Sequence, residues 1–164
     1  MIARFLFPMV AAFIATSAAA TEISGRAEVI DGDTIAVQGF PKRIRIYGID
    51  APEGSQTCED RNAKRYLCGP RSADALYKII GPNGRVSCEE MDRDRYGRIV
   101  AVCKTSSGKD IGEEMVRQGW ALEFVRYSDG RYADAEEDAR ANKRGMHSGS
   151  FVEPWEWRKA RRSR

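Results

Sequence analysis

The chain has 164 residues, of which 27 are Lys or Arg, 24 are Asp or Glu, four are Cys and one is His, and its formal charge is +3. This length suits one domain, and 42% hydrophobic with 31% charged residues is typical of a globular rather than a disordered protein. A single His disfavours Ser-His-Asp catalysis and any metal site built on several histidines.

Residues 1–20 are predicted to be a signal peptide outside the fold. Arg4 precedes an uncharged, mostly apolar run, and Ala18 and Ala20 fit the small-residue cleavage signal. We therefore expect an exported protein, periplasmic or extracellular, whose mature chain begins near Thr21 and is not attached to a membrane. The alternative is an uncleaved membrane anchor, for which the apolar run is short.

The mature chain is predicted to alternate strands and helices in an α+β order. Three strands come first, and a loop over about 50–69 follows. A helix starts at Pro70, a hairpin comes next, and two more helices complete the pattern. The strands are expected over 23–31, 33–38, 42–49, 85–91 and 98–104, and the helices over 70–81, 110–118 and 131–143. Five strands of this length can close a small Greek-key barrel. The predicted domain covers 21–150, and 151–164 is expected to be a frayed basic tail.

Export makes disulfides the expected state of the four cysteines, in preference to free buried thiols. No C-x-x-C motif occurs among them, and one His cannot complete the usual zinc patterns. If Asp94 opposes Gly97 in the turn of the predicted hairpin, the antiparallel register places Cys88 directly opposite Cys103. Elimination then leaves Cys58–Cys68 as the second disulfide.

Acidic side chains and arginines concentrate in three short segments, 29–35, 43–53 and 94–98. Carboxylate oxygens from two segments, without His or thiolate ligands, suit Ca²⁺ rather than zinc. Arginines beside such a cation suit a phosphate, because the guanidinium fork can pair two phosphate oxygens at once. Each segment alone could be a set of solvated ion pairs. Together they indicate phosphoryl-transfer chemistry.

Four motifs in these regions resemble, in order and spacing, the thermonuclease (staphylococcal nuclease-like) family. They are V-I-D-G-D-T, R-I-Y-G-I-D-A-P-E, D-R-Y-G-R and E-E-M-V-R-Q-G-W-A, and the similarity covers about residues 25–145. The resemblance implies an OB-fold barrel with three helices and a Ca²⁺-dependent, sugar-nonspecific nuclease. Such an enzyme hydrolyses DNA and RNA by in-line attack of a metal-activated water and leaves 3′-phosphate products. A monomer without a stable protein partner is expected.

The resemblance also assigns roles by position. Asp33 and Asp50 match the Ca²⁺ ligands, together with the main-chain carbonyl of Ala51. Arg45 and Arg98 match the two arginines that clamp the phosphate.

Further positions match the surroundings of that centre. Glu53 matches the carboxylate beside the attacking water, as general base or as a group that orients the water, and Asp31 matches a nearby supporting acid. Arg95 and Tyr96 match the contacts to a terminal phosphate, where the family has Lys-Tyr. Tyr127 matches an aromatic residue of the base pocket, but the expected aromatic partner two residues earlier is replaced by Val125.

Two other functions are compatible with parts of the pattern. The same barrel serves as a non-catalytic nucleic-acid-binding module when the metal and arginine positions are lost, but all five catalytic and metal-binding side chains are present here. A role in exopolysaccharide assembly or processing is suggested by export, because paired acids are also used by glycosidases. The arginines argue against it, since a neutral glycosidic centre does not need two guanidinium groups.

Overall fold

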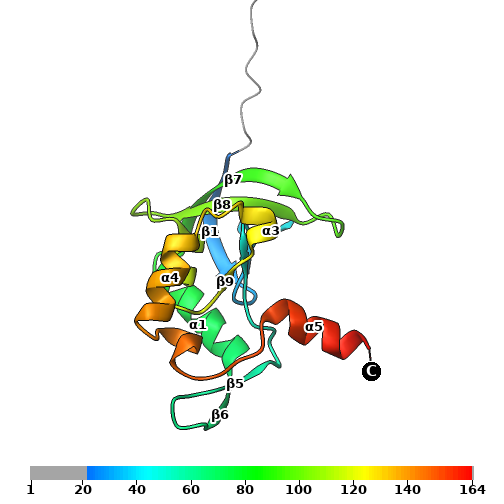
Figure 1. Ribbon diagram of the computed structural model, residues 1–164. Helices are drawn as coiled ribbons and strands as arrows, with labels where there is room; N and C mark the ends of the chain where they lie inside the picture. Colours follow the sequence, from blue (N-terminus) through cyan, green and yellow to red (C-terminus); the bar gives the residue numbers. More distant parts are fainter. Residues whose placement is uncertain (1–21, 164) are drawn as a thin grey trace, which may run out of the picture.

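The fold is built around a closed five-stranded β-barrel (Figure 1). The computed structural model describes residues 22–163, so the predicted signal peptide lies outside the described residues. Strands follow the order β1-β2-β3-β8-β7; β3 and β8 are parallel, and the other neighbours are antiparallel. The barrel strands are Glu22–Val29 (β1), Thr34–Val37 (β2), Arg43–Ile46 (β3), Arg85–Arg93 (β7) and Ile99–Thr105 (β8). This architecture confirms the predicted α+β class with an OB-fold barrel.

The β7–β8 hairpin contains the first predicted disulfide. Cys88 lies opposite Cys103 in the antiparallel register, and the two are bonded. A bulge at Met91 then shifts the register by one residue between the disulfide and the turn. The predicted register is therefore correct at the cysteines and wrong by one residue beside the turn.

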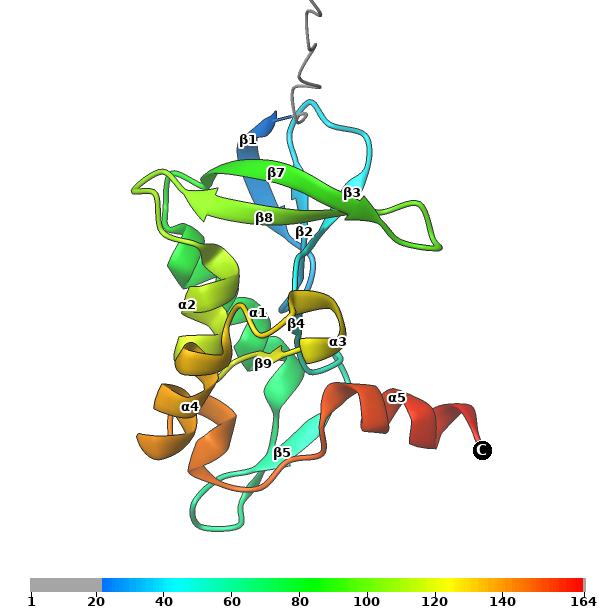
Figure 2. The same cartoon turned by 45° about the horizontal axis from the view of Figure 1, so that its top comes forward.

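Three helices pack beside the barrel close to their predicted positions, and Figure 2 shows α2 and α4 on the same side of the molecule. They are Cys68–Ile80 (α1), Ile111–Arg117 (α2) and Ala133–Ala141 (α4). Asp110 caps α2, because its side chain accepts hydrogen bonds from the backbone N–H groups of Gly112 (2.9 Å) and Glu113 (3.2 Å). The capping pattern therefore located the start of α2 correctly.

The segment 50–69, expected to be a loop, contains short strands. Ile49–Asp50 (β4) pairs with Leu122–Glu123 (β9), and Thr57–Glu59 (β5) pairs with Arg65–Leu67 (β6). The second predicted disulfide, Cys58–Cys68, joins this small hairpin to the start of α1. Strands of two or three residues leave almost no periodic pattern, which is why the sequence did not predict them.

The C-terminal segment differs from the frayed tail that the sequence predicted. It forms a helix, Pro154–Arg162 (α5), and Pro154 occupies the first turn, where its missing N–H breaks no helical hydrogen bond. Before α5 come a short helix, Val125–Ser128 (α3), and a 3-10 helix, Gly145–Ser148 (η1). Figures 1 and 2 show α5 starting near α3 and running away from the barrel.

Aliphatic side chains from the barrel and from α1 and α2 form the main core. Fully buried members include Ile35, Ile44, Leu76, Ile99 and Met115. A smaller cluster packs around the Cys58–Cys68 disulfide. Among the described residues, no helix is long and apolar enough to cross a membrane.

Candidate active site

Two buried carboxylates come from separate strand ends. Asp33 lies in the turn between β1 and β2, and Asp50 ends β4; their exposed fractions are 3% and 0%. The turn passes very close to α1, because a Cβ on Gly32 would lie 2.0 Å from Ser72 Oγ and 2.7 Å from Ala51 Cβ. Only glycine fits there, so this residue allows Asp33 to approach the β4 segment.

Arg45 joins the two carboxylates. Its Nη1 donates to Asp33 Oδ1 at 2.7 Å, and its Nη2 donates to Asp50 Oδ1 at 2.7 Å. The β2–β3 register explains the first contact, since Arg45 pairs with Thr34, the neighbour of Asp33. The structure therefore brings three of the predicted site residues into direct contact.

The electrostatics of this group are dominated by burial and mutual pairing. Burial raises the pKa of Asp33, whereas the positive charge of Arg45 acts to lower it. Burial acts to lower the pKa of Arg45, but Asp33 and Asp50 together raise it. The pairing with Arg45 therefore offsets part of the cost of burying Asp33.

The donor atoms fit an oxygen-preferring cation. Asp33 and Asp50 both accept hydrogen bonds from the Arg45 guanidinium. The buried Ala51 is next to Asp50 in the chain, and its N–H donates to Asp33 Oδ2 at 3.0 Å. Within residues 22–163, no group of three or more His, Cys, Asp or Glu side chains is arranged to hold a metal. A ligand set would therefore combine two carboxylates with main-chain and water oxygens, which suits Ca²⁺ better than zinc.

Glu53 lies in the loop after β4, close to Asp50. Its backbone is tightly packed, since a Cβ on Gly69 would lie 2.1 Å from the Glu53 carbonyl oxygen. Its side chain is 44% exposed, so solvent and substrate can reach it. The structure thus fixes the backbone of Glu53 and leaves its carboxylate partly exposed to solvent.

Arg98 lies at the β7–β8 turn. Its Nε donates to Asp94 Oδ2 at 2.7 Å, and it has no ion pair with Asp33, Asp50 or Glu53 in the described structure. Burial acts to raise the pKa of Asp94, but hydrogen bonds from the Arg98 side chain and from backbone N–H groups hold it below its usual value. The turn therefore holds a pre-oriented arginine.

The predicted substrate contacts at this turn form one cluster. The guanidinium carbons of Arg95 and Arg98 lie 5.0 and 5.8 Å from the centre of the Tyr96 ring, within cation–π range. Tyr96 is 67% exposed, so the cluster faces solvent.

Tyr127 belongs to a different aromatic group. It lies in α3, 54% exposed, with its ring centre 5.1 Å from that of Phe124. Phe124 in turn stacks on Trp155 of α5 at 5.4 Å. Val125, at the position where the family has an aromatic residue, is also exposed. Phe124 and Trp155 therefore pack against each other beside Tyr127.

Arg158 also reaches the site, from α5, and was not predicted from the sequence. Its Nη2 donates to Asp50 Oδ2 at 2.6 Å, and its Nη1 donates to Glu53 Oε1 at 2.8 Å. The available signal was Pro154 as a helix start, followed by a basic segment of helical length.

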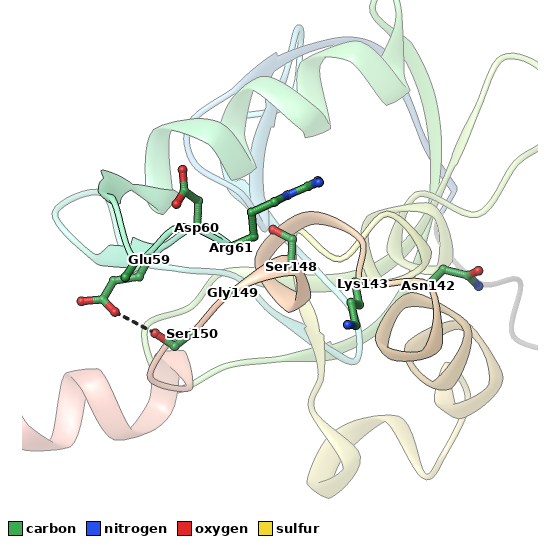
Figure 3. Close-up of a pocket in the computed structure, with 9 residues that line it drawn as sticks. Glu59, Asp60, Arg61, Asn142, Lys143, Ser148, Gly149 and Ser150 are labelled. Atoms are coloured by element: carbon green, nitrogen blue, oxygen red, sulfur yellow. Dashed lines mark hydrogen bonds between the residues drawn. The ribbon is translucent and has the colours of Figure 1, made fainter.

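A cavity of about 670 Å³ lies elsewhere, between the β5–β6 hairpin and the η1 region. Figure 3 shows side chains of both signs around it, including Asp60, Arg61 and Lys143, and the hydrogen bond from Ser150 to Glu59. None of the predicted site residues lines this cavity, so it is separate from the candidate active site.

Residues 43–149 match the family described as staphylococcal nuclease homologue. The chain belongs to this nuclease family. The match includes Arg45, Asp50, Glu53 and Arg98, whereas Asp33 precedes it. Family membership confirms the resemblance stated above and makes the chain a phosphodiester-hydrolysing enzyme.

The chain is similar over most of its length to several other bacterial proteins. An uncharacterized endonuclease of Escherichia coli is 33% identical over 94% of this chain and 97% of its own length. The micrococcal nuclease of Shigella flexneri is 31% identical over 80% of this chain and 78% of its own length. The succinoglycan biosynthesis protein ExoI of Rhizobium meliloti (strain 1021) is 37% identical over 87% of this chain and 75% of its own length.

Proposed function

We propose that the protein is an exported, Ca²⁺-dependent, sugar-nonspecific nuclease that hydrolyses phosphodiester bonds of DNA and RNA and leaves 3′-phosphate ends. The observation that carries this proposal is the contact of one guanidinium with two buried carboxylates, Asp33–Arg45–Asp50. A phosphodiester is anionic and resists an anionic nucleophile. A bound Ca²⁺ would supply the positive charge that offsets this repulsion beside the phosphate.

The chain's own residues would divide the remaining tasks. Asp33, Asp50 and the Ala51 carbonyl would hold the cation. Arg45 would stabilise the charge that grows on the phosphate oxygens, since its Nε has no acceptor among the described residues and remains free to donate. The exposed carboxylate of Glu53 would accept a proton from the attacking water or orient it.

The β7–β8 turn would act on the phosphate from a second direction. Arg98 keeps a fixed orientation through Asp94 and would complete the clamp with its remaining N–H groups. Arg95 and Tyr96 would contact a neighbouring phosphate, and Tyr127 would lie against a base. These contacts do not depend on a particular base, which suits a nuclease of broad substrate range.

Export is supported by the two disulfides, because such bonds persist in oxidising compartments. The predicted signal sequence at 1–20 agrees with this location. We propose a periplasmic or extracellular monomer.

A polysaccharide-linked role is the second candidate, because one relative is named for succinoglycan biosynthesis. The arginine between the two carboxylates favours a phosphodiester substrate instead. A glycosidic centre is neutral, and its hydrolysis uses two carboxyl groups without a guanidinium between them.

Purified protein with intact disulfides tests the proposal when it is incubated with plasmid DNA and with ribosomal RNA in Ca²⁺. We expect both to be degraded. The product ends should accept a 5′ label from polynucleotide kinase but should support primer extension only after treatment with a phosphatase. Cleavage of a neutral glycan without cleavage of DNA or RNA would overturn the assignment.

A further inference from the structure

Helix α5 is attached to the rest of the molecule at few points. Of its nine residues, only Pro154 is buried. The ring of Trp155 stacks on Phe124 with an angle of 14°, and the carbonyl of Val152, just before the helix, accepts a hydrogen bond from Gln56 Nε2 at 2.6 Å. Trp155 also packs against the small cluster around the Cys58–Cys68 disulfide. The ion pairs of Arg158 add a charged attachment at the middle of α5.

Arg158 occupies the carboxylates that the proposed function assigns to the cation and the water. Both of its terminal nitrogens contact Asp50, from Nη1 to Oδ1 at 3.0 Å and from Nη2 to Oδ2 at 2.6 Å. Nη1 also donates to Glu53 Oε1 at 2.8 Å. Asp50 is fully buried, and the Arg158 side chain is 29% exposed. This two-oxygen contact is the strong, planar form of an Arg–carboxylate pair.

The other carboxylate oxygens are also engaged. Asp33 Oδ1 accepts from Arg45 and Thr34, and Asp33 Oδ2 accepts from the N–H of Ala51. Asp50 Oδ1 accepts from Arg45 as well as Arg158, whereas Asp50 Oδ2 accepts from Arg158 alone. A cation can therefore reach Asp50 Oδ2 when one guanidinium moves, and that guanidinium belongs to α5.

We propose that Arg158 competes with the divalent cation for Asp50 and, in the same position, pairs with Glu53. In the metal-free protein it neutralises these carboxylates and closes the site; a bound cation displaces Arg158 and loosens α5. This inference rests on the proposed metal site. Arg45 cannot play the same part, because it lies on barrel strand β3 and contacts Asp50 through one oxygen only.

Only molecules in which Arg158 has left the site can bind the cation. The apparent affinity is therefore the intrinsic affinity multiplied by the fraction of molecules in which the site is open. Removing Arg158 should therefore strengthen Ca²⁺ binding and, in the same variant, lower the stability of the metal-free protein. A residue with a purely structural role would not produce these two opposite effects.

Calorimetric titration with Ca²⁺ and melting curves in EGTA test this on the full mature chain. We expect Arg158→Ala to bind Ca²⁺ about tenfold or more tightly than the unmodified protein and to melt at a lower temperature in EGTA. Arg158→Lys keeps the charge without the planar fork, so its Ca²⁺ affinity and its melting temperature should lie between those of Arg158→Ala and the unmodified protein. Arg161→Ala is the matched control, because Arg161 lies in the same helix and has no ion pair with a carboxylate among the described residues; its guanidinium reaches Ser55 Oγ at 3.4 Å and lies 6.0 Å from the centre of the Trp157 ring. This variant should leave Ca²⁺ affinity unchanged.

Hydrogen exchange of the unmodified protein gives a second measurement that needs no variant. Saturating Ca²⁺ should reduce protection of the backbone amides of residues 155–162. Equal Ca²⁺ affinity in Arg158→Ala and the unmodified protein, or unchanged protection of α5, would overturn the inference while leaving the nuclease assignment intact. If neither protein binds Ca²⁺, the proposed metal site itself fails, and the inference fails with it.

Discussion

Arg45 Nη1 lies 2.7 Å from Asp33 Oδ1, so the arginine expected to hold the phosphate already neutralises a buried carboxylate. Arg45→Ala should therefore have two effects. In the absence of metal, two buried carboxylates lose a partner, and stability should fall by about 3–5 kcal/mol. In saturating Ca²⁺, the folded variant should have a kcat on single-stranded DNA about 10²–10³-fold lower.

The control for this substitution is Arg43→Ala. Arg43 lies on the same strand, is exposed, and has no ion pair in the described part of the chain, so its loss should leave turnover unchanged. Melting curves and turnover should be measured on the same preparations. Near-normal turnover in Arg45→Ala would reject the catalytic role assigned to Arg45.

Arg98 can be tested against a neighbour on the same hairpin. Arg98→Ala should lower kcat by about 10²–10³-fold, because it removes a charged donor from the clamp. Arg93→Ala is the matched control: Arg93 forms a similar 2.7 Å ion pair, with Glu90, but is more exposed, and its loss should leave turnover near normal. Equal effects of the two substitutions would show that Arg98 acts through the hairpin and not on the phosphate.

Metal removal should stop hydrolysis. Activity is expected to disappear in a calcium chelator, to return when Ca²⁺ is added, and not to return with Zn²⁺, since an oxygen-only site suits a hard cation with flexible coordination. Ca²⁺ should also raise the melting temperature, because a ligand that binds only the folded state stabilises it. Asp50→Asn should abolish this shift. Full activity in chelator would contradict the metal roles of Asp33 and Asp50.

Much of the fold could be predicted because strands such as β1 and β3 alternate more buried and less buried residues, and because Asp110 caps α2. The Cys88–Cys103 pair followed from hairpin register alone. The contact of Arg158 with Asp50 could not be derived in this way. The two residues are 108 positions apart, and α5 buries one residue, so its pattern indicates a helix at most and says nothing about where the helix docks. The bulge at Met91 could not be predicted either, because a single extra residue does not change the periodic pattern of the strand enough to be recognised.

Glu53 should affect the chemical step more than binding. Glu53→Gln keeps the shape of the side chain but removes the proton acceptor, so kcat should fall by about 10²–10⁴-fold if Glu53 is the general base. Affinity for a non-hydrolysable nucleotide, measured by calorimetry, should remain. Glu59→Gln, which changes a carboxylate on β5 outside the site, is the control. Unchanged turnover in Glu53→Gln would remove Glu53 from the mechanism.

His147 should make stability depend on pH near neutrality. Burial lowers its pKa, Arg140 acts in the same direction, and Glu136 opposes them. Its Nε2 is buried and has no hydrogen-bond partner among residues 22–163, and its ring packs edge-on against Phe151. The folded protein therefore keeps this His neutral at a pH where the unfolded chain, with a pKa of about 6.5, takes up a proton.

The unfolded state thus binds more protons than the folded state between the folded pKa and about 6.5, so stability should decrease as the pH falls through this window. Melting temperatures at pH 7.5, 6.5 and 5.5 measure the effect. His147→Gln should reduce the pH dependence, because it removes the titrating group and leaves the carboxylates that titrate at lower pH. The difference between the two proteins isolates His147 from those carboxylates. An identical pH dependence in both would show that His147 is protonated as easily in the folded protein as in the unfolded chain.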